Sequence, residues 1–82
     1  MDYDKYSFVL ASPNRQKIVK ALDKEKIPSQ LSKELKMQDA NIARALRELT
    51  IKGIIKCINP ENKRGRIYIL TSDGKSIRNK II

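Results

Sequence analysis

The chain has 82 residues, with 18 Lys or Arg against 9 Asp or Glu and no His, which gives a formal net charge of +9 at pH 7. A chain this short forms one small domain, residues 1–82, whose core has little volume for an enzyme's pocket, so we expect no enzyme. A lone cysteine, Cys57, excludes an internal disulfide, and without His it offers no cluster of metal ligands, so we expect neither metal nor cofactor. No stretch approaches the roughly 20 apolar residues of a membrane span, and the N-terminus lacks a signal-peptide pattern. We therefore expect a cytoplasmic protein with no membrane partner.

The positive charge is concentrated in the second half of the chain. Residues 1–41 hold 8 basic and 6 acidic side chains, whereas residues 42–82 hold 10 basic and 3 acidic ones. A basic excess in one half is typical of a surface that binds a polyanion, and nucleic acid is the commonest such partner. General solubility charge on a lysine-rich protein is the alternative.

The first two predicted elements are helices. In segment 1–11 the apolar residues Tyr3, Tyr6 and Leu10 recur at helical spacing. Next, Ser12 can cap a helix and Pro13 can take its first position, so a second helix is expected over about residues 13–24.

Segment 28–53 predicts two further helices joined by a turn of two or three residues. The first begins at Pro28 or Ser29, and the second covers about residues 38–52 and stops at Gly53. The apolar face of the second helix consists of Ile42, Ala45, Leu46 and Leu49.

The periodicity changes after Gly53. Two short runs rich in β-branched and aromatic residues, "IIKCI" and "RIYILT", flank the turn-forming stretch "NPENKRG", which predicts a β-hairpin over residues 54–71. A short helix over residues 72–82 closes the chain, with a capped start at Ser72 or Asp73, and Gly74 is tolerable in its first turn. The expected fold is therefore mainly α with a small β-hairpin (α+β), in the order α-α-α-α-β-β-α. Three helices followed by a hairpin are typical of a winged helix-turn-helix domain.

Three stretches in this order carry a family resemblance, namely "ASPNRQKIVKAL", "PSQLSKELKMQDANIARALRELTIKGII" and "RIYILTSDG". Over residues 8–77 the chain resembles winged helix-turn-helix transcriptional regulators of the broad ArsR/MarR type, especially the small archaeal members. The resemblance implies double-stranded DNA as partner, transcription regulation, a homodimer and association with the nucleoid. Metal-sensing members use paired Cys or His ligands, which this chain lacks.

The exposed side of helix 38–52 holds the residues expected to enter a major groove. Gln and Asn can pair bidentately with adenine and Arg with guanine, so Gln38, Asn41 and Arg44 are the candidates for base contacts. Small side chains allow close approach to thymine methyl groups. The full predicted set on this helix is Gln38, Asp39, Ala40, Asn41, Ala43, Arg44 and Arg47. As alternatives, Asp39 could act as a helix cap and Arg47 as a phosphate contact or an ordinary solvated charge.

Phosphate contacts are expected from two other places. Ser29 and Gln30 begin the preceding helix, where backbone N–H groups and a hydroxyl could hold one phosphate, although Ser29 could equally be a plain cap. In the basic wing, residues 59–66, we expect Lys63, Arg64 and Arg66 to contact the backbone or an adjacent minor groove. Solvated loop charge is the alternative for these three.

Exposed apolar side chains suggest a second partner. The candidates for dimer contacts are Tyr3, Tyr6, Ile51, Ile77 and Ile81. Phe8, in contrast, is expected to pack on the domain's own core. The rival function is a winged-helix protein–protein interaction module of a larger nucleic-acid assembly, with only non-specific DNA binding.

Overall fold

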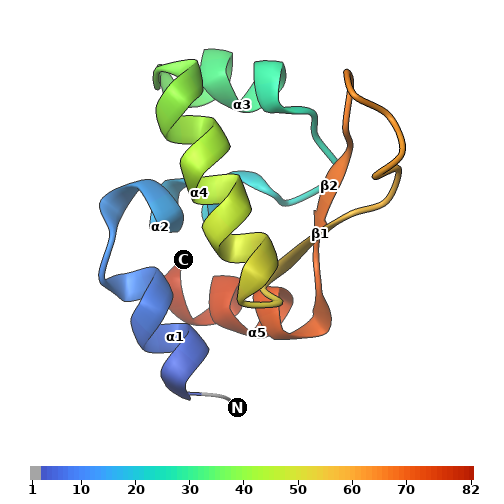
Figure 1. Cartoon of the computed structure of the whole chain (residues 1–82). Coiled ribbons are helices and arrows are strands. Elements are labelled where there is room, and N and C mark those ends of the chain that lie inside the picture. Colours follow the sequence, from blue (N-terminus) through green and yellow to red (C-terminus); the bar gives the residue numbers. More distant parts are fainter. Residues whose placement is uncertain (1–2) are drawn as a thin grey trace.

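The computed structural model describes residues 3–82, which form five helices and one two-stranded antiparallel hairpin (Figure 1). The predicted order of elements and the predominantly helical class are confirmed. The elements are α1 (Tyr3–Leu10), α2 (Pro13–Ala21), α3 (Pro28–Leu35), α4 (Asp39–Ile51), β1 (Ile55–Cys57), β2 (Tyr68–Leu70) and α5 (Ser72–Ile81).

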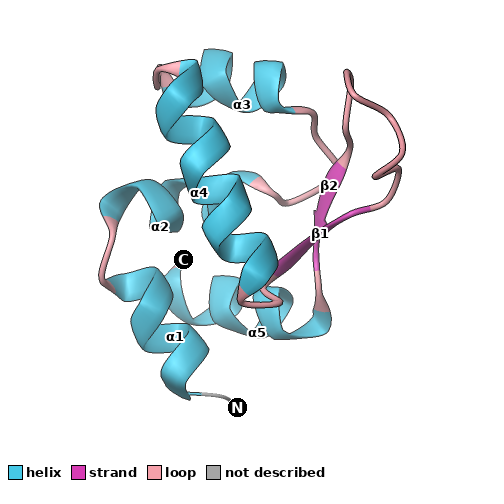
Figure 2. Ribbon diagram, viewed as in Figure 1, coloured by secondary structure: helices cyan, strands magenta, loops and turns pink. Residues whose placement is uncertain are grey.

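The hydrophobic core collects side chains from all five helices and both strands. Helix α4 contributes Ile42, Ala45, Leu46 and Leu49, the same four residues that define its predicted apolar face. Full burial of one such aliphatic side chain contributes about 1.5–3 kcal/mol. Figure 2 shows α4 running from beside α3 down to the level of α5, with the hairpin beside it. The opposite side of α4 is therefore left for solvent or a partner.

Helix α2 begins as predicted but ends earlier. The Ser12 side chain caps it by accepting a hydrogen bond from the Arg15 N–H at 3.3 Å, and Pro13 takes the first helical position. Its last residue is Ala21 rather than residue 24, because the chain leaves the helix to pair with the hairpin. The backbone N–H of Lys26 donates to the Tyr68 carbonyl at 3.2 Å, and the Tyr68 N–H donates back at 2.9 Å.

The first helix of the helix-turn-helix begins at Pro28, one of its two predicted starts. Ile27 is the N-cap of α3, and the Gln30 side-chain oxygen accepts a hydrogen bond from the Ile27 N–H at 2.9 Å. Ser29 therefore lies inside the first turn and is not the cap. Likewise Gln38 is the N-cap of α4 and Asp39 is its first helical residue, so a cap at Asp39 is one residue too late.

The hairpin pairs Ile55 with Leu70 and Cys57 with Tyr68. Leu70 is buried and Tyr68 packs partly against the core, so both residues anchor the base of the wing. The hairpin then continues beyond the strands through a hydrogen bond from the Ile58 N–H to the Ile67 carbonyl, 2.9 Å long.

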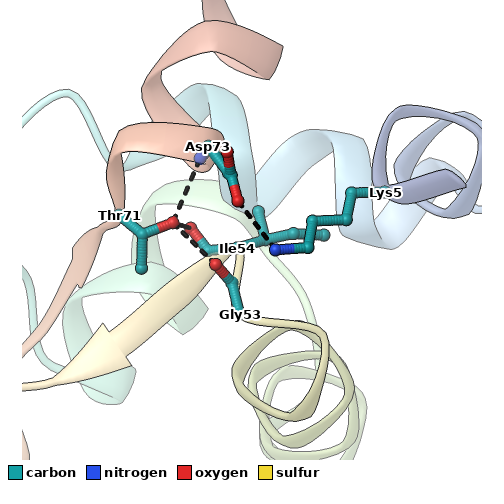
Figure 3. A network of polar contacts seen from close by, with 6 residues as sticks. Lys5, Gly53, Ile54, Thr71 and Asp73 are labelled. Atoms are coloured by element: carbon teal, nitrogen blue, oxygen red, sulfur yellow. Dashed lines mark hydrogen bonds and ion pairs between the residues drawn. The ribbon is translucent and has the colours of Figure 1, made fainter. Parts of the chain in front are cut away.

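One hydroxyl connects the end of α4 to the start of α5. The Thr71 hydroxyl donates toward the carbonyls of Gly53 and Ile54, at 2.7 and 2.9 Å, and accepts from the Gly74 N–H at 3.2 Å (Figure 3). Thr71 is thus the N-cap of α5, and the helix itself begins at Ser72, as predicted. The start of α5 therefore lies directly on the turn that leads from α4 to β1.

Gly74 makes this close approach feasible. A Cβ atom at this position would lie 2.1 Å from the Ile54 carbonyl oxygen. Glycine is therefore required here rather than merely tolerated. Nearby, Lys5 Nζ of α1 contacts Asp73 Oδ2 at 2.7 Å (Figure 3), which fastens the first helix to the last.

Arg15 joins three helices, a role that the sequence did not indicate. Its Nη1 donates to the Phe8 carbonyl at 2.9 Å, its Nε lies 3.3 Å from Glu48 Oε1, and its guanidinium stacks 3.7 Å from the centre of the Phe8 ring. Phe8 is half-buried against the core, as expected. Within residues 3–82, no helix is long and apolar enough to cross a membrane.

Candidate nucleic-acid interface

Helix α4 presents most of the predicted contact residues to solvent. Gln38, Asp39, Ala40, Ala43, Arg44 and Arg47 are exposed, and Asn41 is half-buried. The exposure follows from the helical period, because the four core residues of α4 occupy one side and leave the other uncovered.

A cleft of about 680 Å³ lies between the start of α3, one flank of α4 and the wing tip. Figure 1 shows the loop between β1 and β2 extending to the level of α3 beside this flank. Seven of the predicted contact residues line the cleft: Ser29, Asp39, Ala43, Arg47, Lys63, Arg64 and Arg66. Folding thus brings together side chains from three segments that are separate in the sequence.

The cleft is strongly cationic. Among residues 3–82, Arg47 of α4 and three wing cations line it, against the single carboxylate of Asp39. Because these side chains are exposed, their attraction for an anion is screened by salt over about 10 Å at 0.1 M ionic strength. The arrangement fits a polyanion whose charges are spaced along the cleft.

Arg44 lies on the other flank of α4. Together with Asn41 it lines a smaller depression of about 220 Å³, whose other members include Ser12 and Asn14 at the start of α2. Successive helical residues are rotated by about 100°, so Arg44 and Arg47 are about 60° apart on either side of the exposed face. Gln30, Gln38 and Ala40 line neither depression.

Gln30 has a structural task besides its predicted one. Its side-chain oxygen is used in the cap of α3, which leaves its amide N–H groups as the available donors. Ser29, in the first turn of α3, is exposed at the edge of the cleft.

Lys26 supports the interface from inside, and it was not singled out in the sequence. Its side chain is only 6% exposed, and Nζ lies 2.8 Å from Glu34 Oε2 and 3.1 Å from Asp23 Oδ1. Burial alone would lower the pKa of Lys26, but hydrogen bonds to Glu34 and Asp23 outweigh burial and raise it. The hydrogen bond from Lys26 in turn lowers the pKa of Asp23. Lys26 therefore holds α3 and the hairpin together, since its backbone pairs with Tyr68.

The predicted dimer contacts are distributed unevenly. Tyr3 and Ile51 are 72% and 78% exposed, whereas Tyr6 and Ile81 are partly buried against the core. Ile77 is 1% exposed, so its prediction as a surface contact is wrong, because its side chain fills the chain's own core. Ile51 lines the cationic cleft rather than a surface shared with α1.

Cys57 is half-buried, and its Sγ lies 3.4 Å from Asn59 Oδ1. Across residues 3–82 there is no group of three or more His, Cys, Asp or Glu side chains placed to hold a metal ion.

Neither a family model nor a curated protein matches the chain. Solved structures do. A MarR family transcription regulator superposes with a TM-score of 0.78 at 27% identity, over 95% of this chain and 54% of that one. The reduced form of MarR from E. coli gives 0.76 at 24% identity, over 90% and 59% of the two chains. A cysteine-to-serine mutant of MarR from E. coli, complexed with operator DNA, gives 0.68 at 28% identity, over 93% and 57%.

The chain is a winged helix-turn-helix domain. More particularly, its structural neighbours are MarR-family transcription regulators, so the resemblance to the MarR type expected from the sequence is confirmed. The chain spans between 54% and 59% of the length of these neighbours.

Proposed function

We propose that the chain binds double-stranded DNA as a transcriptional regulator, with α4 in the major groove and the wing on the backbone or an adjacent minor groove. The observation that carries this proposal is the cleft in which Arg47 of α4 and the wing cations Lys63, Arg64 and Arg66 lie together. The neighbour in complex with operator DNA supports it.

The dimensions of the partners favour this arrangement. A B-DNA major groove is about 12 Å wide, and an α-helix with its side chains is about 10–12 Å across. A helix in the groove has a phosphate backbone along each flank. The cationic cleft on one flank of α4 would hold one backbone, with Ser29, Gln30 and Arg47 as further phosphate contacts.

Base contacts would come from the exposed start of α4. Gln38, Asn41 and Arg44 supply donors and acceptors, and Ala40 and Ala43 allow the helix axis to come close to the base edges. The carboxylate of Asp39 also lines the cleft, and its place in the first turn of α4 favours a role in stabilising the helix N-terminus.

We further propose that the protein acts as a homodimer on a pseudo-palindromic site, with Tyr3 and Ile81 among the contacts. Tyr3 is 72% exposed and Ile81 lies at the end of α5, so both can be reached by a second copy of the chain. Sedimentation at rising protein concentration tests the homodimer, and a strictly monomeric protein on DNA would refute it.

We also propose that the protein acts in the cytoplasm, at the nucleoid, and that its role is not enzymatic.

A random-pool selection of bound DNA tests the function. We expect enrichment of a motif with two half-sites one helical turn apart, or a multiple of it. An unenriched pool would instead favour the protein–protein interaction module. The observation that favours that alternative is the apolar side chain of Ile51, which is 78% exposed within the cationic cleft.

A further inference from the structure

The side chain of Asn59 closes the base of the loop at the tip of the wing. Its Oδ1 accepts a hydrogen bond from the Ile67 N–H at 2.7 Å, and its Nδ2 donates to the Gly65 carbonyl at 3.1 Å. Its own backbone carbonyl accepts from the Asn62 N–H at 3.0 Å. Asn59 thus connects both sides of the loop at the point where the hairpin ladder stops.

The three wing cations are not equivalent. Arg66 Nε donates to the Asn62 carbonyl at 2.7 Å, so this guanidinium is folded back onto the loop that carries it. Lys63 and Arg64 make no side-chain hydrogen bond or ion pair with any residue of the described range 3–82. Both are exposed and line the cleft opposite Arg47.

We infer that Asn59 is a positioning residue for DNA binding, which presents Lys63 and Arg64 to the phosphate backbone by ordering the wing tip in advance. This inference rests on the proposed function. In it, Arg66 braces the tip from within, and the other two cations make the ionic contacts.

The physical reason is the entropy of the loop. An unclosed loop must be ordered when it binds, and each flexible side chain or loop segment that becomes fixed weakens association. The hydrogen bonds of Asn59 fix the backbone before DNA arrives. Gly65, whose φ is +66°, allows the sharp turn that brings its carbonyl toward Asn59.

The test is a double-mutant cycle on DNA affinity, with a neighbouring asparagine as control. Asn59→Ala removes the side-chain hydrogen bonds with the Ile67 N–H, the Gly65 carbonyl and Cys57 Sγ. Asn62→Ala is the matched control, because Asn62 takes part in the loop only through its backbone. Each change is made in the wild type and in a Lys63→Ala, Arg64→Ala background. A 30-base-pair duplex is titrated by fluorescence anisotropy, and amide hydrogen exchange is followed at Ile67.

We expect Asn59→Ala to weaken DNA binding about fivefold in the wild type and to have almost no effect in the background without the two cations. Asn62→Ala should bind as the wild type does. Exchange at the Ile67 N–H should accelerate in Asn59→Ala while the melting temperature stays near that of the wild type, because Asn59 lies outside the core.

Two results would overturn the inference. One is an Asn59→Ala variant that binds as tightly as the wild type, and the other is an equal loss in both backgrounds, which would place its effect elsewhere in the fold. If Asn59→Ala did not fold, an Ile67 N–H that exchanges as fast as a free peptide in the wild type would also overturn it. Failure of the wild type to bind any duplex would instead refute the proposed function.

Discussion

At the scale of single residues, two positions require glycine for different reasons. Gly74 has no room for a side chain, whereas Gly65 has room but adopts a positive φ. At Gly74, an added Cβ would lie 2.1 Å from the Ile54 carbonyl oxygen, whereas at Gly65 it would meet no atom within 4 Å. Gly65 instead has a φ of +66°, which is unfavourable for other residues.

Gly74→Ala should therefore destabilise the domain by about 3 kcal/mol, because α5 must move away from the turn after α4. Gly65→Ala should cost only about 1 kcal/mol, from backbone strain alone. Urea denaturation of both variants measures the difference. Equal costs would show that α5 does not approach the Ile54 carbonyl so closely.

Lys26 gives stability a dependence on pH at both ends of the scale. The pKa of Lys26 is raised above 10.5 in the folded protein. Its contribution to the free energy of unfolding is therefore complete below pH 10.5 and is lost as the pH rises through the folded-state pKa. The pKa of Asp23 is lowered from 3.8, so its contribution is present above that value and is lost as the pH falls through the folded-state pKa.

Lys26→Met should remove both of these pH dependences while keeping an apolar stem of similar length in place. Unfolding free energies from pH 2 to 12 test this, with Lys24→Met, an exposed neighbour, as control. If Lys26→Met and the wild type ran parallel at both ends, the buried ion pairs with Asp23 and Glu34 would not form in solution.

At the scale of elements, α4 carries two arginines that face different flanks. Arg47 lines the cleft with the wing, and Arg44 lines the depression beside the start of α2. The proposed roles therefore differ, with Arg44 in base contact and Arg47 on phosphate.

Arg44→Ala should reduce the preference for the selected site over a scrambled duplex by about 1–3 kcal/mol. Arg47→Ala, the same change about 60° away on the helix, should weaken binding to both duplexes alike. Fluorescence anisotropy titrations with the selected and the scrambled duplex measure the affinities of both variants. A uniform loss for Arg44→Ala would move this residue to the backbone contacts.

The elements were predictable from sequence where local chemistry determines them. The Ser12–Pro13 start of α2, the apolar face of α4 and the turn residues of the hairpin each specify their element locally. Features that depend on residues distant in the sequence were not predictable. Gly74 gave no sign of its contact with Ile54, and Ile77 resembled a surface residue until α5 was placed on α2.

The candidate site was predictable in its residues but not in its grouping. Helical periodicity indicates which side chains of α4 are exposed, but it does not tell which flank the wing covers. The cleft unites Arg47 with the wing, whereas Arg44 lies apart, because the hairpin packs beside one flank of α4 only. The buried position of Lys26 could not be foreseen either, since lysine is rarely buried and its partners lie on both sides of it in the chain.

At the scale of the whole molecule, the excess of basic residues becomes a shaped surface. The formal charge of +9 does not by itself specify a partner. The fold gathers four of the cations around one cleft beside the helix proposed to enter the major groove. If the chain is a DNA-binding regulator, Arg47, Lys63 and Arg64 should neutralise phosphates of the same duplex that α4 contacts, while Arg66 holds the wing tip in place.

The salt dependence of DNA binding tests this claim most directly. Each neutralised phosphate contributes about 0.9 to the slope of log K against log salt concentration, so Lys63→Ala with Arg64→Ala should lower the slope by about 1.8 on any duplex. Lys75 is an exposed cation of α5 outside the cleft, so Lys75→Ala is the control. It should leave the slope of log K against log salt concentration close to that of the wild type. An unchanged slope in the double variant would contradict the account, because the wing would then not touch the DNA.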